Sequence, residues 1–154
     1  MTPTAAERLP YVDEHTVEIA ADRTTTWEAL AQVAERSMSG GGAPRYARLI
    51  GCADTEAAGP RPLAVGSAFP GFHVAAAAPG EELDLLGSHN FSDYALTFRL
   101  EEPGPGRTRL RAETRAVFPG LKGGVYRGLV IGTRLHVLVT RRILGGVKRR
   151  AERG

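Results

Sequence analysis

The C-terminal segment is the feature that most constrains the fold. Basic residues recur at every seventh position from Arg127 to Lys148, which places them on one side of a helix. At about 100° per residue, the opposite side carries an apolar face with one imidazole: Val125, Leu129, Gly132, His136, Val139 and Ile143. We therefore predict a single helix over residues 123–150, roughly 40 Å long at about 1.5 Å per residue, whose apolar face covers a sheet.

Three glycines in this segment lie four residues apart, at Gly124, Gly128 and Gly132. Each costs about 1 kcal/mol of helix propensity relative to Ala, so a structural use is expected to compensate. Two uses are open: another backbone packs close to this low ridge, or space is left free beside it.

The rest of the chain shows strand patterns before and after a short helical region. Residues Tyr11–Ala20 alternate as a strand, and Thr25 with Glu28 forms a capping-box pattern for a first helix. A second short helix is predicted from Pro44 to Ile50, ended by Gly51. Four strand-like runs follow, with a bend expected at Pro70-Gly71 in the first: Val65–Ala77, Glu82–His89, Phe91–Leu100 and Thr108–Phe118.

Alternation in the last two runs separates an inward set from an outward set. Every second residue from Tyr94 to Leu100 and from Leu110 to Phe118 is apolar or small, including Phe98, Ala112 and Thr114. The residues between them are mostly charged, Asp93 and Arg99 among them. We expect the first set to face inward and the second to form a solvated outer surface.

This order of elements predicts an α+β fold. It comprises a curved antiparallel sheet of about six to seven strands wrapped around a long C-terminal helix, with one or two short helices after the first strand. The length of 154 residues suits one domain, so we assign residues 1–154 to a single ligand-binding domain. Small inward residues such as Ala112 and Gly132 predict a cavity between sheet and helix.

Charge is distributed unevenly along the chain. Residues 122–154 hold nine Lys or Arg and one acid, whereas residues 1–121 hold eleven and sixteen. A basic helix on an acidic body indicates a solvated face, and without interleaved aromatic residues it does not favour nucleic acid. The single Cys52 excludes an intramolecular disulfide, and the N-terminus lacks an apolar signal segment, so we expect a soluble cytoplasmic protein.

No sequence motif assigns a reaction. There is no Walker loop, GxSxG elbow, HExxH helix or clustered carboxylate pair, and His15, His73, His89 and His136 lack metal-ligand spacing. We therefore expect neither a metal nor another cofactor.

Two residues are the candidates for chemistry. His136 on the apolar helix face is either a core histidine bonded to backbone or water, or a general base or ligand anchor. Tyr94 on the inward strand face either packs in the core with its hydroxyl at the rim or reaches a pocket. His89 belongs to the surface or to a pocket mouth. We predict a ligand-binding set of His136, Gly132, Leu129, Tyr94, Phe98, Ala112, Thr114 and Tyr126.

Several segments resemble the SRPBCC superfamily, the START-related helix-grip proteins that include polyketide cyclase-like proteins. The similar segments are AADRTTTWEAL from Ala20, GSAFPGFHV from Gly66, LDLLGSHNFSDYALTFRL from Leu83 and VFPGLKGGVYRGLVIGTRLH from Val117. The resemblance implies a deep apolar pocket under the C-terminal helix that binds lipids, polyketides or similar molecules. Some members of this superfamily also catalyse cyclisation or dehydration, and many only bind their ligand.

Two functional hypotheses follow. The first is a binding protein for a small hydrophobic molecule, with or without a cyclase or dehydratase step carried by His136 and Tyr94. The alternative is an interaction module that docks through its basic C-terminal helix on an anionic lipid surface or a protein partner, without catalysis. Salt separates them, because screening weakens a surface electrostatic contact far more than a buried apolar one.

Overall fold

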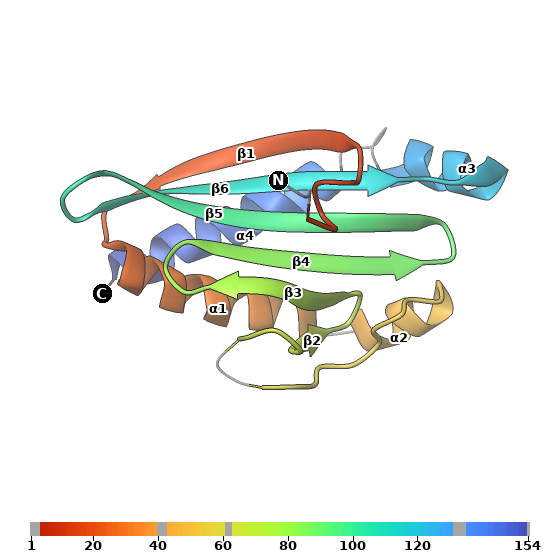
Figure 1. The fold of residues 1–154 in the computed structure, drawn as a ribbon, viewed down its shortest axis with the longest axis horizontal. Helices are drawn as coiled ribbons and strands as arrows, with labels where there is room; N and C mark the ends of the chain where they lie inside the picture. Colours follow the sequence, from red (N-terminus) through yellow and green to blue (C-terminus); the bar gives the residue numbers. More distant parts are fainter. Residues whose placement is uncertain (1–3, 40–42, 61–62, 131–134, 154) are drawn as a thin grey trace.

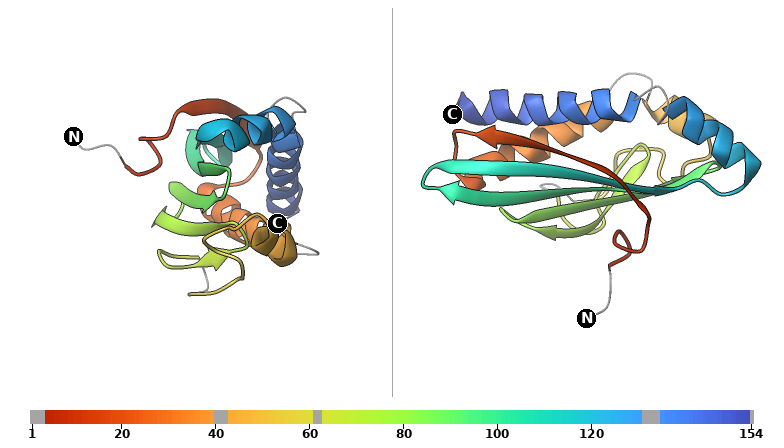
Figure 2. Two further views of the ribbon diagram at one scale, coloured as in Figure 1. Left: turned by 90° about the vertical axis from the view of Figure 1, so that its right-hand side faces the viewer. Right: turned by 90° about the horizontal axis from the view of Figure 1, so that it is seen from above.

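The computed structural model describes residues 4–39, 43–60, 63–130 and 135–153. Its elements, in chain order, are β1 (Tyr11–Ile19), α1 (Arg23–Ser39), α2 (Ala43–Leu49), β2 (Ala68–Phe69), β3 (Phe72–Ala78), β4 (Glu82–His89), β5 (Ser92–Gly104), β6 (Arg107–Val117), α3 (Gly120–Val130) and α4 (Leu135–Glu152). The strands form one antiparallel sheet in the order β1-β6-β5-β4-β3-β2 (Figure 1). The sheet curls around α1 and α4, which both cover one face of it, called here the inner face (Figure 2). The predicted α+β helix-grip architecture is confirmed.

The helical region after β1 follows the prediction except at its first residue. Asp22 caps α1, because its carboxylate accepts a hydrogen bond from the Thr25 backbone N–H at 2.7 Å. The expected cap at Thr25 is wrong, since Thr25 is already inside the helix. The second helix ends as predicted before Gly51, whose φ of 72° lies in the left-handed region. The expected bend at Pro70-Gly71 is the turn between β2 and β3.

The C-terminal segment forms two helices rather than the predicted single one. α3 lies beyond the end of the sheet and runs in a different direction from α4 (Figure 2). α4 packs against both α1 and β1, and its buried residues recur at three- and four-residue spacing: Thr140, Ile143, Leu144, Val147 and Ala151. Val139 is 49% exposed and Val125 of α3 is 61% exposed, so their predicted inward positions are wrong. The buried face of α4 is rotated toward α1, which the periodicity of α4 alone does not specify.

Most basic residues of α4 face solvent as expected. Arg141, Arg142 and Arg149 are exposed. Lys148 is half-buried and donates to the Glu18 backbone carbonyl at 2.8 Å and to Glu152 at 2.6 Å. The Glu152 carboxylate also accepts the Ala20 backbone N–H, so these contacts fasten the end of α4 to the end of β1.

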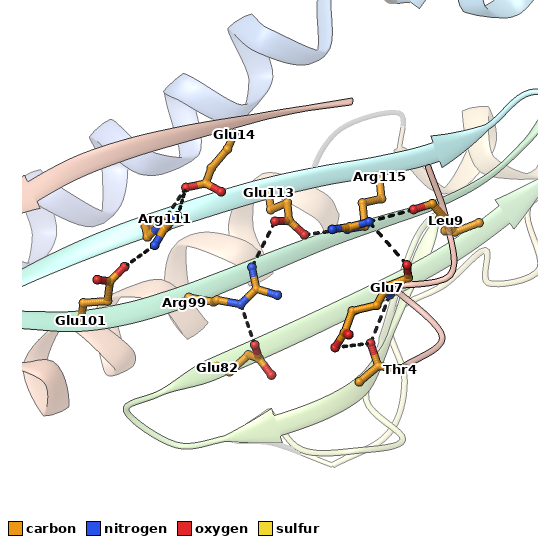
Figure 3. A network of polar contacts seen from close by, with 10 residues as sticks. All are labelled: Thr4, Glu7, Leu9, Glu14, Glu82, Arg99, Glu101, Arg111, Glu113 and Arg115. Carbon is orange, nitrogen blue, oxygen red and sulfur yellow. Dashed lines mark hydrogen bonds and ion pairs between the residues drawn. The ribbon is translucent and has the colours of Figure 1, made fainter. Parts of the chain in front are cut away.

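The outer face of the sheet carries a network of ion pairs (Figure 3). Arg99 lies between Glu82 at 2.9 Å and Glu113 at 3.3 Å, and Arg115 contacts the other oxygen of Glu113 at 2.7 Å. Arg111 bridges Glu14 at 2.6 Å and Glu101 at 2.8 Å in the same way. These residues face outward as the alternation predicts.

The outer face is more covered than a solvated surface would be. Arg115 donates to the backbone carbonyls of Leu9 at 3.0 Å and Glu7 at 3.4 Å, which holds residues 4–9 across the strands (Figure 3). Ala95 and Thr97 beneath this layer are each 2% exposed. The N-terminal segment and the long charged side chains together bury the small residues of the outer face.

Asp84 of β4 is a buried carboxyl on this face. It is 4% exposed, and its Oδ1 has no hydrogen-bond partner in the described part of the chain. Burial, reinforced by the negative charge of Glu82, raises the pKa of the Asp84 carboxyl. The ionised form is therefore less stable in the folded protein than in water.

The packing of α4 predicts a sharp contrast between two leucines. Leu144 is 4% exposed and Leu138 is 57% exposed. Leu144→Ala should lower the free energy of unfolding by about 2–5 kcal/mol, because it leaves a cavity in the core. Leu138→Ala should change it by less than about 0.5 kcal/mol. Urea unfolding measures both, and equal losses would contradict the packing described.

The burial of Asp84 predicts a pH-dependent gain on removing its charge. A carboxyl whose pKa is raised on folding costs no stability below its unfolded pKa, and the cost grows as pH rises above that value. Asp84→Asn should therefore stabilise the protein more at pH 7 than at pH 4, as measured by thermal unfolding at each pH. The gain is measured against Asp93→Asn, which makes the same change at an exposed position of the same face.

Candidate functional site

The inner face of the sheet is covered unevenly along its length. Where α1 and α4 lie, its residues are at most 5% exposed: Leu83, Leu85, Phe98, Leu100, Leu110 and Ala112. Toward α3 the inner face also carries half-buried residues beside buried Leu96 and Ala116: Phe72, His89, Tyr94, Thr114 and Phe118. We take this α3 end of the inner face as the candidate site.

Tyr94 is fixed in the site by two glycines. Its ring lies over Gly87 of the neighbouring strand, where an added Cβ would come within 2.5 Å of the ring. Its hydroxyl donates to the backbone carbonyl of Gly71 in the β2–β3 turn. The Gly71 N–H in turn donates to the Asp54 carbonyl at 2.7 Å, and Phe72 packs edge-on against the tyrosine ring. Because Gly87 has no side chain, the Tyr94 ring can cross β4 and its hydroxyl can contact the β2–β3 turn.

The hydroxyl of Tyr94 stays protonated at neutral pH. Burial, followed by the nearby Cys52, raises the pKa of Tyr94 far above its ordinary value. The Cys52 sulfur lies 3.9 Å from the Tyr94 oxygen, and burial raises the pKa of this thiol as well. Neither group is therefore a ready base or nucleophile. Because the hydroxyl proton is committed to Gly71, Tyr94 has only its oxygen lone pairs left for a ligand.

His89 is held in a defined tautomer. Its Nδ1 accepts a hydrogen bond from the Phe91 backbone N–H at 3.0 Å, so the proton of the neutral ring is on Nε2. Burial lowers the pKa of His89 and outweighs the opposing effect of the Asp93 charge. The lowered pKa favours the neutral ring at pH 7. The sequence left His89 either at the surface or at a pocket mouth. In the structure His89 lies among the aromatic side chains of the candidate site, with its Nε2–H as a donor. The turn sequence carries no signal for this role.

Tyr126 of α3 joins His89 and Phe91 in one aromatic group. Its ring stacks on Phe91 with 5.4 Å between centroids and meets His89 edge-on at 4.8 Å. α3 comes this close to the sheet because Gly123 has no side chain: a Cβ there would lie 2.6 Å from the Phe118 backbone. Tyr126 therefore reaches the candidate site from within α3, and its role in ligand binding stays a prediction.

The structure brings the predicted strand residues together. Tyr94 pairs with Ala116, Leu96 with Thr114, and Phe98 with Ala112, so all lie on the inner face. Phe98 and Ala112 are fully buried core residues, whereas Tyr94 and Thr114 keep part of their surface exposed. On the helix side, Gly132 and the side chains of Leu129 and His136 lie outside the described residues, so the roles of these three stay predictions.

The chemistry available in the site is that of an apolar surface with a few polar groups. The described residues contain no group of three His, Cys, Asp or Glu side chains that could hold a metal ion. Polar atoms of the described residues toward α3 include the His89 Nε2–H, the Thr114 hydroxyl and the Tyr94 oxygen. Such a site can hold a hydrophobic molecule and contact a small number of its oxygen atoms.

No family model and no curated protein sequence matches the chain. Solved structures do match its fold. The aromatase/cyclase ZhuI from Streptomyces sp. R1128 is 20% identical over 94% of both chains, with a TM-score of 0.53. Protein CV1439 from Chromobacterium violaceum is 11% identical over 92% of this chain and 99% of its own, with a TM-score of 0.54.

The di-domain aromatase/cyclase StfQ of the steffimycin pathway is 13% identical, with a TM-score of 0.54. The match covers 92% of this chain and 45% of StfQ. The chain shares its helix-grip fold with these structures. At these identities the similarity shows the fold alone, and the helix-grip assignment agrees with the sheet order and the two covering helices.

The close approach to Gly87 can be tested by comparing alanine substitutions at two strand glycines, Gly87 and Gly104. Gly87→Ala should lower the free energy of unfolding by about 1–3 kcal/mol, because the new methyl group would meet the Gly71 carbonyl oxygen at 2.0 Å. Gly104→Ala is the matched control, since nothing lies within 4 Å of its added Cβ, and should cost less than about 0.5 kcal/mol. Chemical unfolding compares them. A Gly87 variant as stable as the control would contradict the contact.

Proposed function

We propose that this protein binds a small hydrophobic molecule, such as a polyketide or a lipid, against the α3 end of its inner sheet face. The observation that carries the proposal is the change in burial along that face. The helices fully cover the half over Phe98 and Leu110 and leave the half around Tyr94 and Thr114 partly uncovered. A ligand there would remove apolar surface from water at about 25 cal/mol per Å².

The residues of the site favour a ring-bearing ligand with oxygen atoms. Phe72, Phe91, Tyr94 and Tyr126 offer ring faces and edges for stacking. The His89 Nε2–H and the Thr114 hydroxyl can donate to a carbonyl or phenolic oxygen. A plain alkyl chain would leave these polar groups unpaired, which costs binding free energy. The aromatase/cyclases ZhuI and StfQ share the fold and support a polyketide-like ligand.

A cyclase or dehydratase step at this site would need a group that moves a proton. Tyr94 is poorly suited, because its proton is bound to Gly71 and its pKa is raised. The candidates are His89, whose neutral ring is compatible with proton transfer near neutral pH, and His136 from α4. We propose binding as the function and these histidines as the residues to examine for turnover.

Filling the open half of the site should block binding. Thr114→Leu replaces a half-buried inner-face hydroxyl with a larger apolar side chain, and Thr16→Leu makes the same change at an exposed outer-face position paired with Arg111. We expect Thr114→Leu to weaken binding of the aromatic probe 1-anilinonaphthalene-8-sulfonate at least about tenfold, or about 1.4 kcal/mol. Thr16→Leu should have no effect.

Fluorescence titration measures the affinity of each variant for the probe. Native mass spectrometry of the purified protein detects a retained natural ligand. Circular dichroism confirms that both variants are folded. Equal probe affinities for the wild type and Thr114→Leu would place binding elsewhere and contradict the proposal.

A further inference from the structure

Helix α3 turns an apolar strip toward solvent. Leu121 is 87% and Val125 is 61% exposed, and a Cβ added at exposed Gly124 or Gly128 would meet no atom from outside the local helix backbone within 4 Å. These four residues, called here the α3 strip, follow helical spacing and share one side of the helix. The opposite side carries buried Gly123 and half-buried Tyr126, which pack on the end of the sheet. α3 is therefore amphipathic with part of its apolar surface outside the fold.

Basic residues border the α3 strip. At about 100° per residue, Lys122 and Arg127 fall on either side of Leu121 and Val125, and both are exposed. The sequence contains no acidic residue between Glu113 and Glu152. The surface of α3 thus combines exposed apolar and basic side chains.

Neighbouring helices also expose apolar residues. The start of α4 exposes Leu138 and Val139 beside Arg141 and Arg142, and α2 exposes Leu49. Figures 1 and 2 place α2, α3 and the start of α4 at the same end of the molecule. None of the helices in the described part of the chain has the length and apolarity of a membrane span. An attachment of this end to a lipid surface would therefore be lateral.

We infer that this end of the protein docks on an anionic lipid bilayer, with the α3 strip in the interface and Lys122 and Arg127 on lipid phosphates. An interfacial helix needs an apolar side to enter the headgroup region and basic residues at its borders, and α3 has both. A second copy of this chain fits less well. A symmetric contact through α3 would set Lys122 and Arg127 against the same charges.

The docking surface lies on the far side of α3 from the candidate site. Tyr126 contacts His89 and Phe91 on the inner side of the helix, while Leu121 and Val125 face outward. A hydrophobic ligand bound as proposed above would then exchange with the bilayer at the same end of the molecule. That consequence rests on the proposed function, whereas the docking itself does not.

Co-sedimentation with vesicles tests the inference. Wild-type protein should bind vesicles of phosphatidylcholine mixed with phosphatidylglycerol at least about tenfold more tightly than vesicles of phosphatidylcholine alone, and high salt should weaken this binding. Leu121→Ser combined with Val125→Ser should weaken it at least about tenfold. Lys122→Gln combined with Arg127→Gln should remove the preference for anionic vesicles.

Val65→Ser is the matched control for Val125→Ser, because Val65 is 64% exposed on a loop outside α3. It should leave vesicle binding unchanged. The inference is overturned if wild-type protein binds neither vesicle, if the α3 variants bind like the wild type, or if the control loses binding equally. Sedimentation velocity that shows a dimer abolished by the Leu121 and Val125 changes would assign the strip to a second copy and also overturn it.

The same variants separate this inference from the proposed function. The α3 strip variants should bind 1-anilinonaphthalene-8-sulfonate in solution as the wild type does, because Leu121 and Val125 are outside the inner face. Thr114→Leu should lose the probe and keep vesicle binding. Each proposal can therefore fail alone.

Discussion

The fold depends on the burial of the inner sheet face by α1 and α4. Leu30 of α1 and Ile143, Leu144 and Val147 of α4 share one apolar cluster with Phe98 and Leu110 of the sheet. Burying a side chain of this size contributes roughly 1.5–3 kcal/mol, which is a large part of the 5–15 kcal/mol by which a domain is stable. The two helices cover only part of the sheet's length, and residues toward α3 such as Tyr94 and Thr114 stay partly exposed.

The outer face is stabilised in a different way. Half-buried arginine–glutamate pairs and the N-terminal segment cover small side chains there, and Arg115 links the two layers through Glu113 and the Leu9 carbonyl. Single exposed pairs contribute little, but a connected network with fixed geometry orders several long side chains together. Asp84 beneath it opposes this gain, since its carboxyl is buried with an unpaired oxygen.

α3 connects the candidate site to the surface. Gly123 lets the helix approach the sheet, Tyr126 completes the aromatic group, and the remaining sides of the helix face solvent. The site and the proposed docking surface are therefore two sides of one helix.

The sequence by itself determined which residues share a face. Two-residue alternation placed Tyr94, Phe98, Ala112 and Thr114 on the inner face and Asp93 and Arg99 on the outer one, because successive strand side chains point to opposite sides. Seven-residue spacing likewise identified the exposed side of α4 at Arg141. The segments that resemble the superfamily, together with the order of elements in the sequence, indicated the helix-grip fold that the solved structures support.

Only the tertiary structure decided what packs on each face. Helical periodicity defines an apolar side, but the neighbours decide which way it turns: α4 turns toward α1 and β1, and α3 leaves Leu121 and Val125 in solvent. The reach of Tyr94 over Gly87 and the contacts of His89 join residues from separate strands and a distant turn. Such contacts depend on the register and curvature of the whole sheet, which no local pattern encodes.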